Sequence, residues 1–200
     1  MTDYEHTWDQ RLRIKTTGRD DSHADRYRHP YEPTPYSVLE RLADSGLIGP
    51  EDTVLDYGCG KGRVDCFLSR ETGARTVGIE YDERIYADAV ENQKAAGTDT
   101  EILLTRAERY AVPHGVNRCY FFNPFSVEIL HKVLARILDS WYDAPRELFL
   151  FFYYPSEEYI ACVMGVDELE FYDEIVCDDL FAGSDPRERI LIFQLPSYDV

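Results

Sequence analysis

Three glycines and an acid that follow apolar runs are the residues best suited to bind a nucleotide-like ligand. The stretch VLDYGCGKGRV, residues 54–64, contains Gly58, Gly60 and Gly62. Glycine permits backbone conformations and a close ligand approach that a Cβ atom would block, and a helix starting after these glycines would offer free N–H groups to an anionic group. Glu80 ends the next apolar run and could accept hydrogen bonds from both hydroxyls of a ribose. These features predict a site for an adenosine-type ligand.

The spacing of the glycines separates the possible kinds of nucleotide site. A dinucleotide-binding fingerprint reads GxGxxG, but Arg63 stands three positions after Gly60 and the third glycine comes early. In a P-loop the lysine is followed by Ser or Thr, whereas Lys61 is followed by Gly62. The sequence therefore matches neither pattern.

The pattern Asp-x-Gly-Cys-Gly-x-Gly at 56–62, with an acid ending the second strand, resembles class I S-adenosylmethionine-dependent methyltransferases over roughly residues 31–195. The resemblance implies S-adenosyl-L-methionine as cofactor and S-adenosyl-L-homocysteine as product. It implies that Asp56 helps to hold the amino group of the methionyl part and that Glu80 binds the ribose. The chain reads TRAERY where the family often has Asp-Ala beside the adenine, so Ala107 and Glu108 are candidate adenine contacts. The cofactor-binding residues implied in this way are Tyr31, Glu32, Thr34, Asp56, Gly58, Gly60, Glu80, Tyr81, Ala107 and Glu108.

A second motif, FFNPFS at 121–126, is similar to the Asn/Asp-Pro-Pro-aromatic motif of amino-group methyltransferases, with Phe125 in place of the second proline. It also resembles the Asn-Asn-Phe turn of Rossmann-type lysine methyltransferases, whose upstream loop is comparable to YEPTPY at 31–36. An Asn side-chain oxygen and a proline-fixed carbonyl can accept the two hydrogens of an amine. A phenyl ring can face a nitrogen that gains positive charge. Asn123, Pro124 and Phe125 are therefore the predicted catalytic residues.

These motifs together predict methyl transfer to an amine, either a protein lysine or a small amine. In-line positioning can itself contribute roughly 7–11 kcal/mol to such a reaction, so neither a metal nor a covalent nucleophile is required. Neither His114 nor His131 is identified as a general base. Two other functions stay open: a non-catalytic protein that binds an S-adenosyl ligand, and, from another enzyme class, a nicotinamide-dependent oxidoreductase.

Alternating strand-like and helix-like segments must position these motifs. Apolar runs predict strands at 53–58, 74–80, 101–105, 118–123, 147–154, 169–177 and 187–195. Helices are expected with Thr34, Asp82 and Ser126 as N-caps, after Gly62, and near 156–165. Runs buried on both faces and joined by helices predict an α/β fold with one doubly wound, mostly parallel seven-stranded sheet and helices on both faces. The resemblance adds a reversed C-terminal hairpin.

Residues 1–30 are polar and mixed in charge, so a loosely ordered N-terminal arm is expected before the methyltransferase domain at 31–200. The alternative is a lid, because the stiff aromatic segment RYRHPYEPTPY at 26–36 directly precedes the first confident helix.

Charge and composition limit the partners and the location. The formal net charge is −17, a field that repels phosphate backbones, so a cationic acceptor is expected and nucleic acid is not. Five cysteines without a CxxC pair predict buried free thiols and no zinc site. No apolar run approaches the ~20 residues that span a bilayer, and the N-terminus lacks a signal segment. A soluble cytoplasmic protein without membrane contact is expected.

Overall fold

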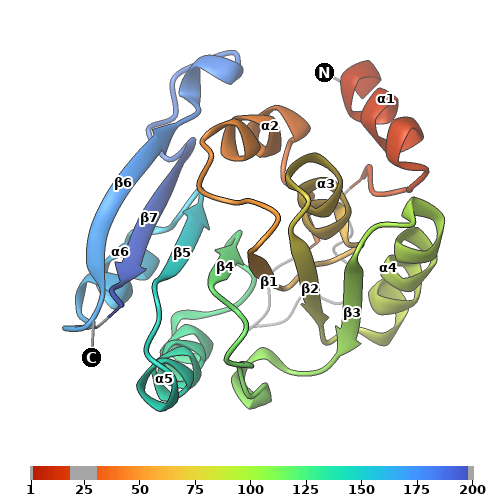
Figure 1. The fold of residues 1–200 in the computed structure, drawn as a ribbon. Coiled ribbons are helices and arrows are strands. Elements are labelled where there is room, and N and C mark those ends of the chain that lie inside the picture. Colours follow the sequence, from red (N-terminus) through yellow and green to blue (C-terminus); the bar gives the residue numbers. More distant parts are fainter. Residues whose placement is uncertain (1, 19–30, 198–200) are drawn as a thin grey trace.

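A seven-stranded sheet runs through the molecule (Figure 1). The computed structural model describes residues 2–18 and 31–197. The strands are β1 (Thr53–Tyr57), β2 (Arg75–Glu80), β3 (Thr100–Leu104), β4 (Arg118–Phe121), β5 (Leu148–Tyr153), β6 (Glu170–Val176) and β7 (Arg189–Leu195), in the order β3-β2-β1-β4-β5-β7-β6. Strands β1 to β5 pair in parallel, whereas β7 pairs antiparallel with β5 and β6. The predicted mostly parallel sheet and its reversed C-terminal hairpin are confirmed.

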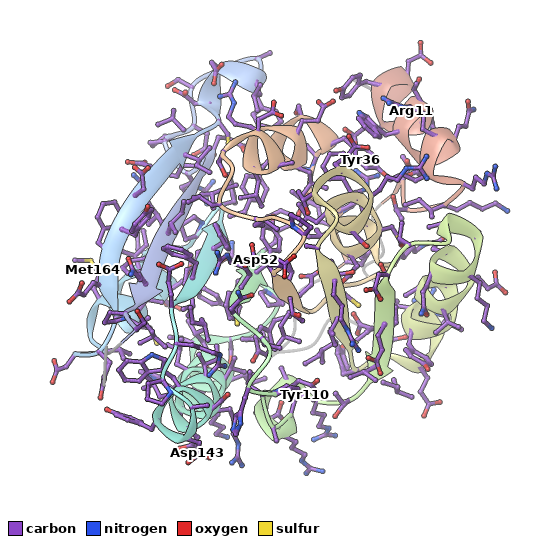
Figure 2. All side chains as sticks on the ribbon, in the orientation of Figure 1. Arg11, Tyr36, Asp52, Tyr110, Asp143 and Met164 are labelled. Carbon is purple, nitrogen blue, oxygen red and sulfur yellow. The ribbon has the colours of Figure 1, made fainter. Side chains whose placement is uncertain are left out.

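Helices cover both faces of this sheet, as predicted. They are α1 (Thr2–Leu12), α2 (Tyr36–Asp44), α3 (Arg63–Thr72), α4 (Glu83–Ala96), α5 (Val127–Asp143) and α6 (Glu157–Met164), with the short 3-10 helices η1 (Ala107–Arg109) and η2 (Asp178–Leu180). One apolar core joins α5 and α6 to the sheet, and a second core joins α1, α2 and α3 to its other face. Figure 2 shows the side chains between these layers, with Tyr36 between the helices of the second face.

The central strands are buried on both faces. Every residue of β5 is buried. Leu148, Leu150 and Phe152 belong to the core under α5, while Phe149 and Phe151 belong to the opposite core. Because successive strand residues alternate between the faces, a strand covered on both sides has a continuous apolar sequence. This explains why LFLFFY forms a strand although it shows no alternation.

The N-terminal residues are more ordered than the sequence predicts. Instead of a loosely ordered arm, Thr2–Leu12 form α1, in which Trp8 and Leu12 are buried. Trp8 stacks on Tyr36 with 5.6 Å between ring centroids and meets Phe67 edge-on at 5.0 Å. Burial of these few apolar side chains stabilises a short helix that would be marginal in isolation.

The three predicted N-caps have different outcomes. Asp82 caps α4 by accepting hydrogen bonds from two backbone N–H groups, as predicted. Thr34 does not cap α2: Pro35 occupies the N-cap position, and the Thr34 hydroxyl is hydrogen-bonded to the Tyr120 hydroxyl at 3.0 Å. Ser126 precedes α5, but its hydroxyl is buried and makes no capping bond. A tertiary contact thus overrides the local capping preference at Thr34, whereas Ser126 occupies the N-cap position without a side-chain bond.

Two further predictions concern the state of the cysteines and the presence of a membrane-spanning helix. All five cysteines are buried and free, as predicted. Within residues 2–18 and 31–197, no helix combines the length and the apolar character needed to cross a membrane.

Candidate active site

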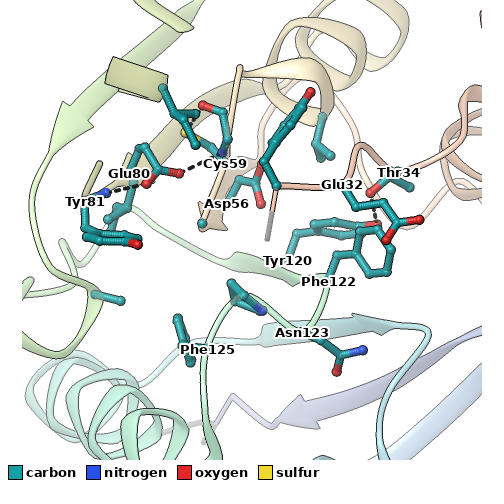
Figure 3. Close-up of a pocket in the computed structure, with 18 of the residues that line it drawn as sticks. Glu32, Thr34, Asp56, Cys59, Glu80, Tyr81, Tyr120, Phe122, Asn123 and Phe125 are labelled. Carbon is teal, nitrogen blue, oxygen red and sulfur yellow. Dashed lines mark hydrogen bonds between the residues drawn. The ribbon is translucent and has the colours of Figure 1, made fainter. Parts of the chain in front are cut away.

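One pocket brings together all of the predicted site residues. It lies at the carboxyl ends of β1, β2 and β4 (Figure 3), where open α/β sheets bind their ligands. The predicted cofactor-binding residues that line it are Tyr31, Glu32, Thr34, Asp56, Gly58, Gly60, Glu80, Tyr81, Ala107 and Glu108, and the predicted catalytic residues are Asn123, Pro124 and Phe125. Lining residues that the sequence did not identify include Arg63, Thr105, Tyr120 and Phe122.

The loop between β1 and α3 requires its glycines. Gly58 and Gly60 have φ angles of +76° and +56°, in the left-handed region. A Cβ atom on Gly58 would lie 2.4 Å from the Pro124 Cβ, and one on Gly60 would lie 2.4 Å from ring atoms of Tyr31. The glycines therefore let the β4 turn and the segment at Tyr31 pack directly against the loop.

Glu80 ties the end of β2 to this loop. Its Oε2 accepts a hydrogen bond from the Gly60 N–H at 3.1 Å, and its Oε1 accepts one from the Tyr81 N–H at 2.7 Å (Figure 3). The same Oε1 also accepts a bond from the Asp82 N–H at 2.8 Å. Burial raises the pKa of Glu80, and the three backbone bonds oppose that rise. A carboxylate has about four lone-pair sites, so Glu80 can order the loop and still accept a ribose hydroxyl.

Asp56 is a buried acid with an open hydrogen-bonding position beside the loop. Only 3% of its surface is exposed, and its Oδ2 has no donor among the described residues. Burial raises its pKa well above the usual range, and the neighbouring Asp65 and Glu80 add to the rise. A cationic group nearby would have the opposite effect. The orphaned oxygen, the glycine cradle and Glu80 together fit the amino and ribose groups of an S-adenosyl ligand.

Tyr81, Ala107 and Glu108, which include the predicted adenine contacts, form a further wall of the pocket. Tyr81 directly follows β2, while Ala107 and Glu108 belong to η1 after β3. The Thr105 N–H donates to the Glu80 carbonyl at 2.9 Å, which holds the two strand ends together. This wall offers an aromatic ring, an apolar surface and a carboxylate, groups that can stack on and hydrogen-bond to a base.

The turn after β4 is strained and linked to the turn after β5. Asn123 has a φ of +41° and Tyr154 a φ of +50°. The Asn123 Nδ2 donates to the Tyr154 carbonyl at 2.5 Å, and its Oδ1 accepts from the Ser156 N–H at a long 3.4 Å. In Figure 3 the Asn123 amide points away from Glu80 and Asp56. Its observed bonds therefore fix the turn, although the residue was predicted to contact the amine directly.

The segment at residues 31–34 covers the glycine loop. The Tyr31 hydroxyl donates to the Thr16 carbonyl at 2.6 Å, and its ring lies against Gly60. Burial raises the pKa of Tyr31, so its phenol stays protonated. The predicted lid at 26–36 is described only from residue 31 onward, and residues 26–30 lie outside the described part of the chain.

Arg63 joins three segments of chain at this site. Its side chain is 2% exposed and stacks on the Tyr36 ring, with the guanidinium carbon 4.2 Å from the ring centroid. It donates to the Thr16 hydroxyl at 2.7 Å and to the Thr34 carbonyl at 3.1 Å, and it forms an ion pair with Glu5 of α1. A single arginine after the glycines gave no sequence signal for this role, because its partners lie 29 to 58 positions away.

The chain is similar to methyltransferases in sequence over part of its length. Residues 54–145 match a family model described as a methyltransferase domain. A curated protein-lysine N-methyltransferase of Saccharolobus islandicus is 26% identical over 84 residues, which are 42% of this chain and 52% of the relative. The match therefore spans about half the length of that relative.

Solved structures share the fold at low sequence identity. An RNA methyltransferase from Salinibacter ruber in complex with S-adenosyl-L-homocysteine aligns with a TM-score of 0.57 and 19% identity, covering 84% of this chain and 97% of its own. A SAM-dependent methyltransferase from Aquifex aeolicus aligns with a TM-score of 0.61 and 15% identity, covering 78% and 89%. Together with the strand order, these matches show that the chain has the Rossmann-like fold of class I S-adenosylmethionine-dependent methyltransferases, and that its residues 54–145 are similar to a methyltransferase domain.

Proposed function

We propose that this protein transfers a methyl group from S-adenosylmethionine to an amine, with the side chain of a protein lysine as the leading acceptor. The observation that carries the proposal is the pocket itself, in which the glycine loop, Asp56 and Glu80 lie opposite the turn that contains Asn123. The partial match to a protein-lysine N-methyltransferase supports the choice of acceptor.

The acceptor side of the pocket has features that suit an alkyl ammonium group. Phe122 lines the pocket, and its ring centroid lies 4.7 Å from that of Tyr153 and 6.4 Å from that of Tyr154. Glu32 lies on the same side in Figure 3. Aromatic faces and a carboxylate attract a cation while they contact its methylene chain. Tyr153 is buried behind Phe122, and its hydroxyl donates a hydrogen bond to Glu188 at 2.6 Å.

The residues of the chain would act mainly by binding and orientation. When bound, S-adenosylmethionine would supply a methyl group activated by its sulfonium. The amine nitrogen would bond to that methyl carbon as the carbon–sulfur bond breaks, with the electron pair staying on sulfur. Asp56 and Glu80 would hold the cofactor, and Asn123 would fix the β4 turn against the β5 turn so that the amine approaches in line. The Tyr120 phenol stays neutral because burial raises its pKa well above the usual range. The amine must be neutral when it attacks and gives its proton to solvent.

Two measurements test the proposal in sequence. First, S-adenosylhomocysteine at about 100 times its dissociation constant should add about 2.7 kcal/mol to the free energy of unfolding. A thermal unfolding curve that does not move, in protein freed of carried-over cofactor, would contradict the proposal.

Second, cofactor labelled in its methyl group should pass the label to an amine. Lysine-containing proteins, small amines and RNA from a cell extract serve as separate acceptor pools. RNA is included because structures with this fold include RNA methyltransferases. Label in the protein pool at lysine supports the proposal, and label in RNA alone refutes the amine acceptor. Binding without transfer to any pool would favour a non-catalytic binding protein, and binding of NAD in place of the S-adenosyl ligand would favour an oxidoreductase.

A further inference from the structure

Two buried acids meet behind the glycine loop. Asp56 lies in β1 and lines the pocket, whereas Asp65 lies in the first turn of α3 and does not line it. Asp65 is 0% exposed, and neither of its carboxyl oxygens has a hydrogen-bond partner among the described residues. A buried carboxyl group without such a partner is costly, and neither cofactor binding nor methyl transfer as described so far uses Asp65.

The backbone of β2 leaves space for this second acid. A Cβ atom at Gly78 would lie 2.8 Å from the Asp65 Oδ2 and 2.7 Å from the Cys59 Sγ. Because Gly78 has no Cβ atom, the Asp65 carboxyl group has room to lie between α3 and β2. The backbone of β2 at Gly78 thus leaves space for the Asp65 carboxyl group.

Asp56 of β1 pairs with Gly78 of β2 in the sheet, and a Cβ atom at Gly78 would lie 2.8 Å from the Asp65 Oδ2, so the two carboxyl groups lie close together. Ionised carboxylates can only accept hydrogen bonds, so the two groups can bond to each other only while one of them keeps a proton. Burial raises the pKa of both acids, that of Asp65 to about 7. Like charges that close together cannot both ionise readily.

Among the residues that the structure describes, the groups that face the pair do not supply a positive charge. Glu80 faces it from β2, Cys59 from the loop, Cys66 from α3 and Tyr120 from β4. Arg63 lies two positions before Asp65, but its guanidinium donates to the Thr16 hydroxyl and the Thr34 carbonyl. A cation that enters the pocket beside Asp56 would therefore be its first positive neighbour.

We propose that Asp65 is a positioning residue for cofactor binding: it shares a proton with Asp56 and keeps that proton when Asp56 ionises to face the ammonium group of the methionyl part. The inference rests on the proposed function, because it takes an S-adenosyl ligand as the source of the ammonium. In the bound state the neutral Asp65 carboxyl donates to the Asp56 carboxylate. Any second proton on the free pair is released to solvent on binding, which couples cofactor affinity to pH.

Isothermal titration calorimetry of S-adenosylhomocysteine between pH 6 and 7.5 tests this coupling. The wild-type affinity should rise roughly tenfold across this range, because one proton released per ligand changes affinity up to tenfold per pH unit. Titrations at pH 6 in two buffers of different ionisation enthalpy should show proton release. Asp65→Asn, whose amide is a permanent donor to Asp56, should keep the affinity at pH 7.5 within about threefold and flatten the pH dependence.

The ligand 5′-methylthioadenosine is the matched control, because it shares the adenosine part but lacks the amino group. Its affinity should not depend on pH and its binding should release no proton, and this comparison holds even if Asp65→Asn fails to fold. Proton release with both ligands, or a pH-independent affinity for S-adenosylhomocysteine in wild type, would overturn the inference. Failure of S-adenosylhomocysteine to bind at any pH would instead overturn the proposed function.

Discussion

Glu80 uses both oxygens of its carboxylate on the backbone, so its removal should weaken the cofactor site in two ways. Glu80→Ala removes an acceptor for the ribose and releases the Gly60 N–H that it holds at 3.1 Å. Hydrogen bonds to a charged group contribute roughly 1.5–3 kcal/mol each, so we expect S-adenosylhomocysteine affinity to fall by one to two orders of magnitude in calorimetry. Glu83→Ala, at an exposed position in the next helix, should bind like wild type. Equal affinities for folded Glu80→Ala and wild type would remove Glu80 from the site.

Asn123 combines an unusual backbone with a bridging amide, and two variants separate these contributions. Asn123→Ala removes the bonds to Tyr154 and Ser156 and puts a Cβ-bearing residue without a polar side chain at a φ of +41°. Asn123→Gly removes the same bonds but tolerates that φ. Both variants should bind S-adenosylmethionine within a few-fold of wild type while kcat falls on the order of a hundredfold, the scale of a lost orienting contact. The measurement is steady-state methyl transfer to the acceptor found in the screen.

If Asn123→Gly transfers at the wild-type rate and Asn123→Ala does not, the backbone conformation matters and the amide does not. Wild-type kcat in both variants would show that the residue has no part in positioning the amine.

At the scale of elements, α1 and the segment before α2 are parts of the pocket wall. Arg63 links them to α3 through Glu5, Thr16 and Thr34. Arg63→Leu would leave the half-buried Glu5 and the buried Asp9 without their cationic partner, and removing one partner of a buried pair typically costs 3–5 kcal/mol. We expect a comparable loss in the free energy of unfolding measured with urea, and faster amide hydrogen exchange in residues 2–18. Arg70→Ala, on the exposed side of the same helix, should change neither quantity.

Unchanged exchange in residues 2–18 of a folded Arg63→Leu protein would show that α1 is held by its apolar contacts alone. Trp8 and Leu12 would then be the anchors to test.

The same elements show what the sequence could and could not predict. Strands such as β5 were predictable because burial on both faces requires a continuous apolar run. Helix α1 was missed because only Trp8 and Leu12 face the core from a polar segment. The glycines, Glu80 and the β4 turn were predictable because their chemistry depends on local order along the chain. Arg63 and Asp65 were not, because their roles arise from partners brought together only by folding.

For the whole molecule, the buried acid pair should make stability depend on pH with a defined sign. An acid whose pKa is raised by folding binds more protons in the folded state, so its stabilising contribution is complete below its unfolded pKa and is lost as the pH rises through the folded pKa. For Asp65 this window runs from about 4, the ordinary value, to about 7. Asp9 acts oppositely: its pKa is lowered by bonds from Thr16 and Tyr36 against the effect of burial, so its contribution is lost below the ordinary value.

We therefore expect the free energy of unfolding of the ligand-free protein to fall between pH 4.5 and 7.5. Relative to Asp65→Asn, the fall across this range should be about 3 kcal/mol, because each pH unit between the unfolded and folded pKa values of Asp65 contributes about 1.36 kcal/mol and part of the loss has already occurred at pH 4.5. Urea unfolding at several pH values measures both proteins, and Glu71→Gln, an exposed acid on the same helix, should follow the wild-type curve. The net charge of −17 repels itself increasingly as the acids ionise, but this effect is common to all three proteins. Parallel curves for wild type and Asp65→Asn would show that Asp65 titrates like an ordinary acid and that the pair shares no proton.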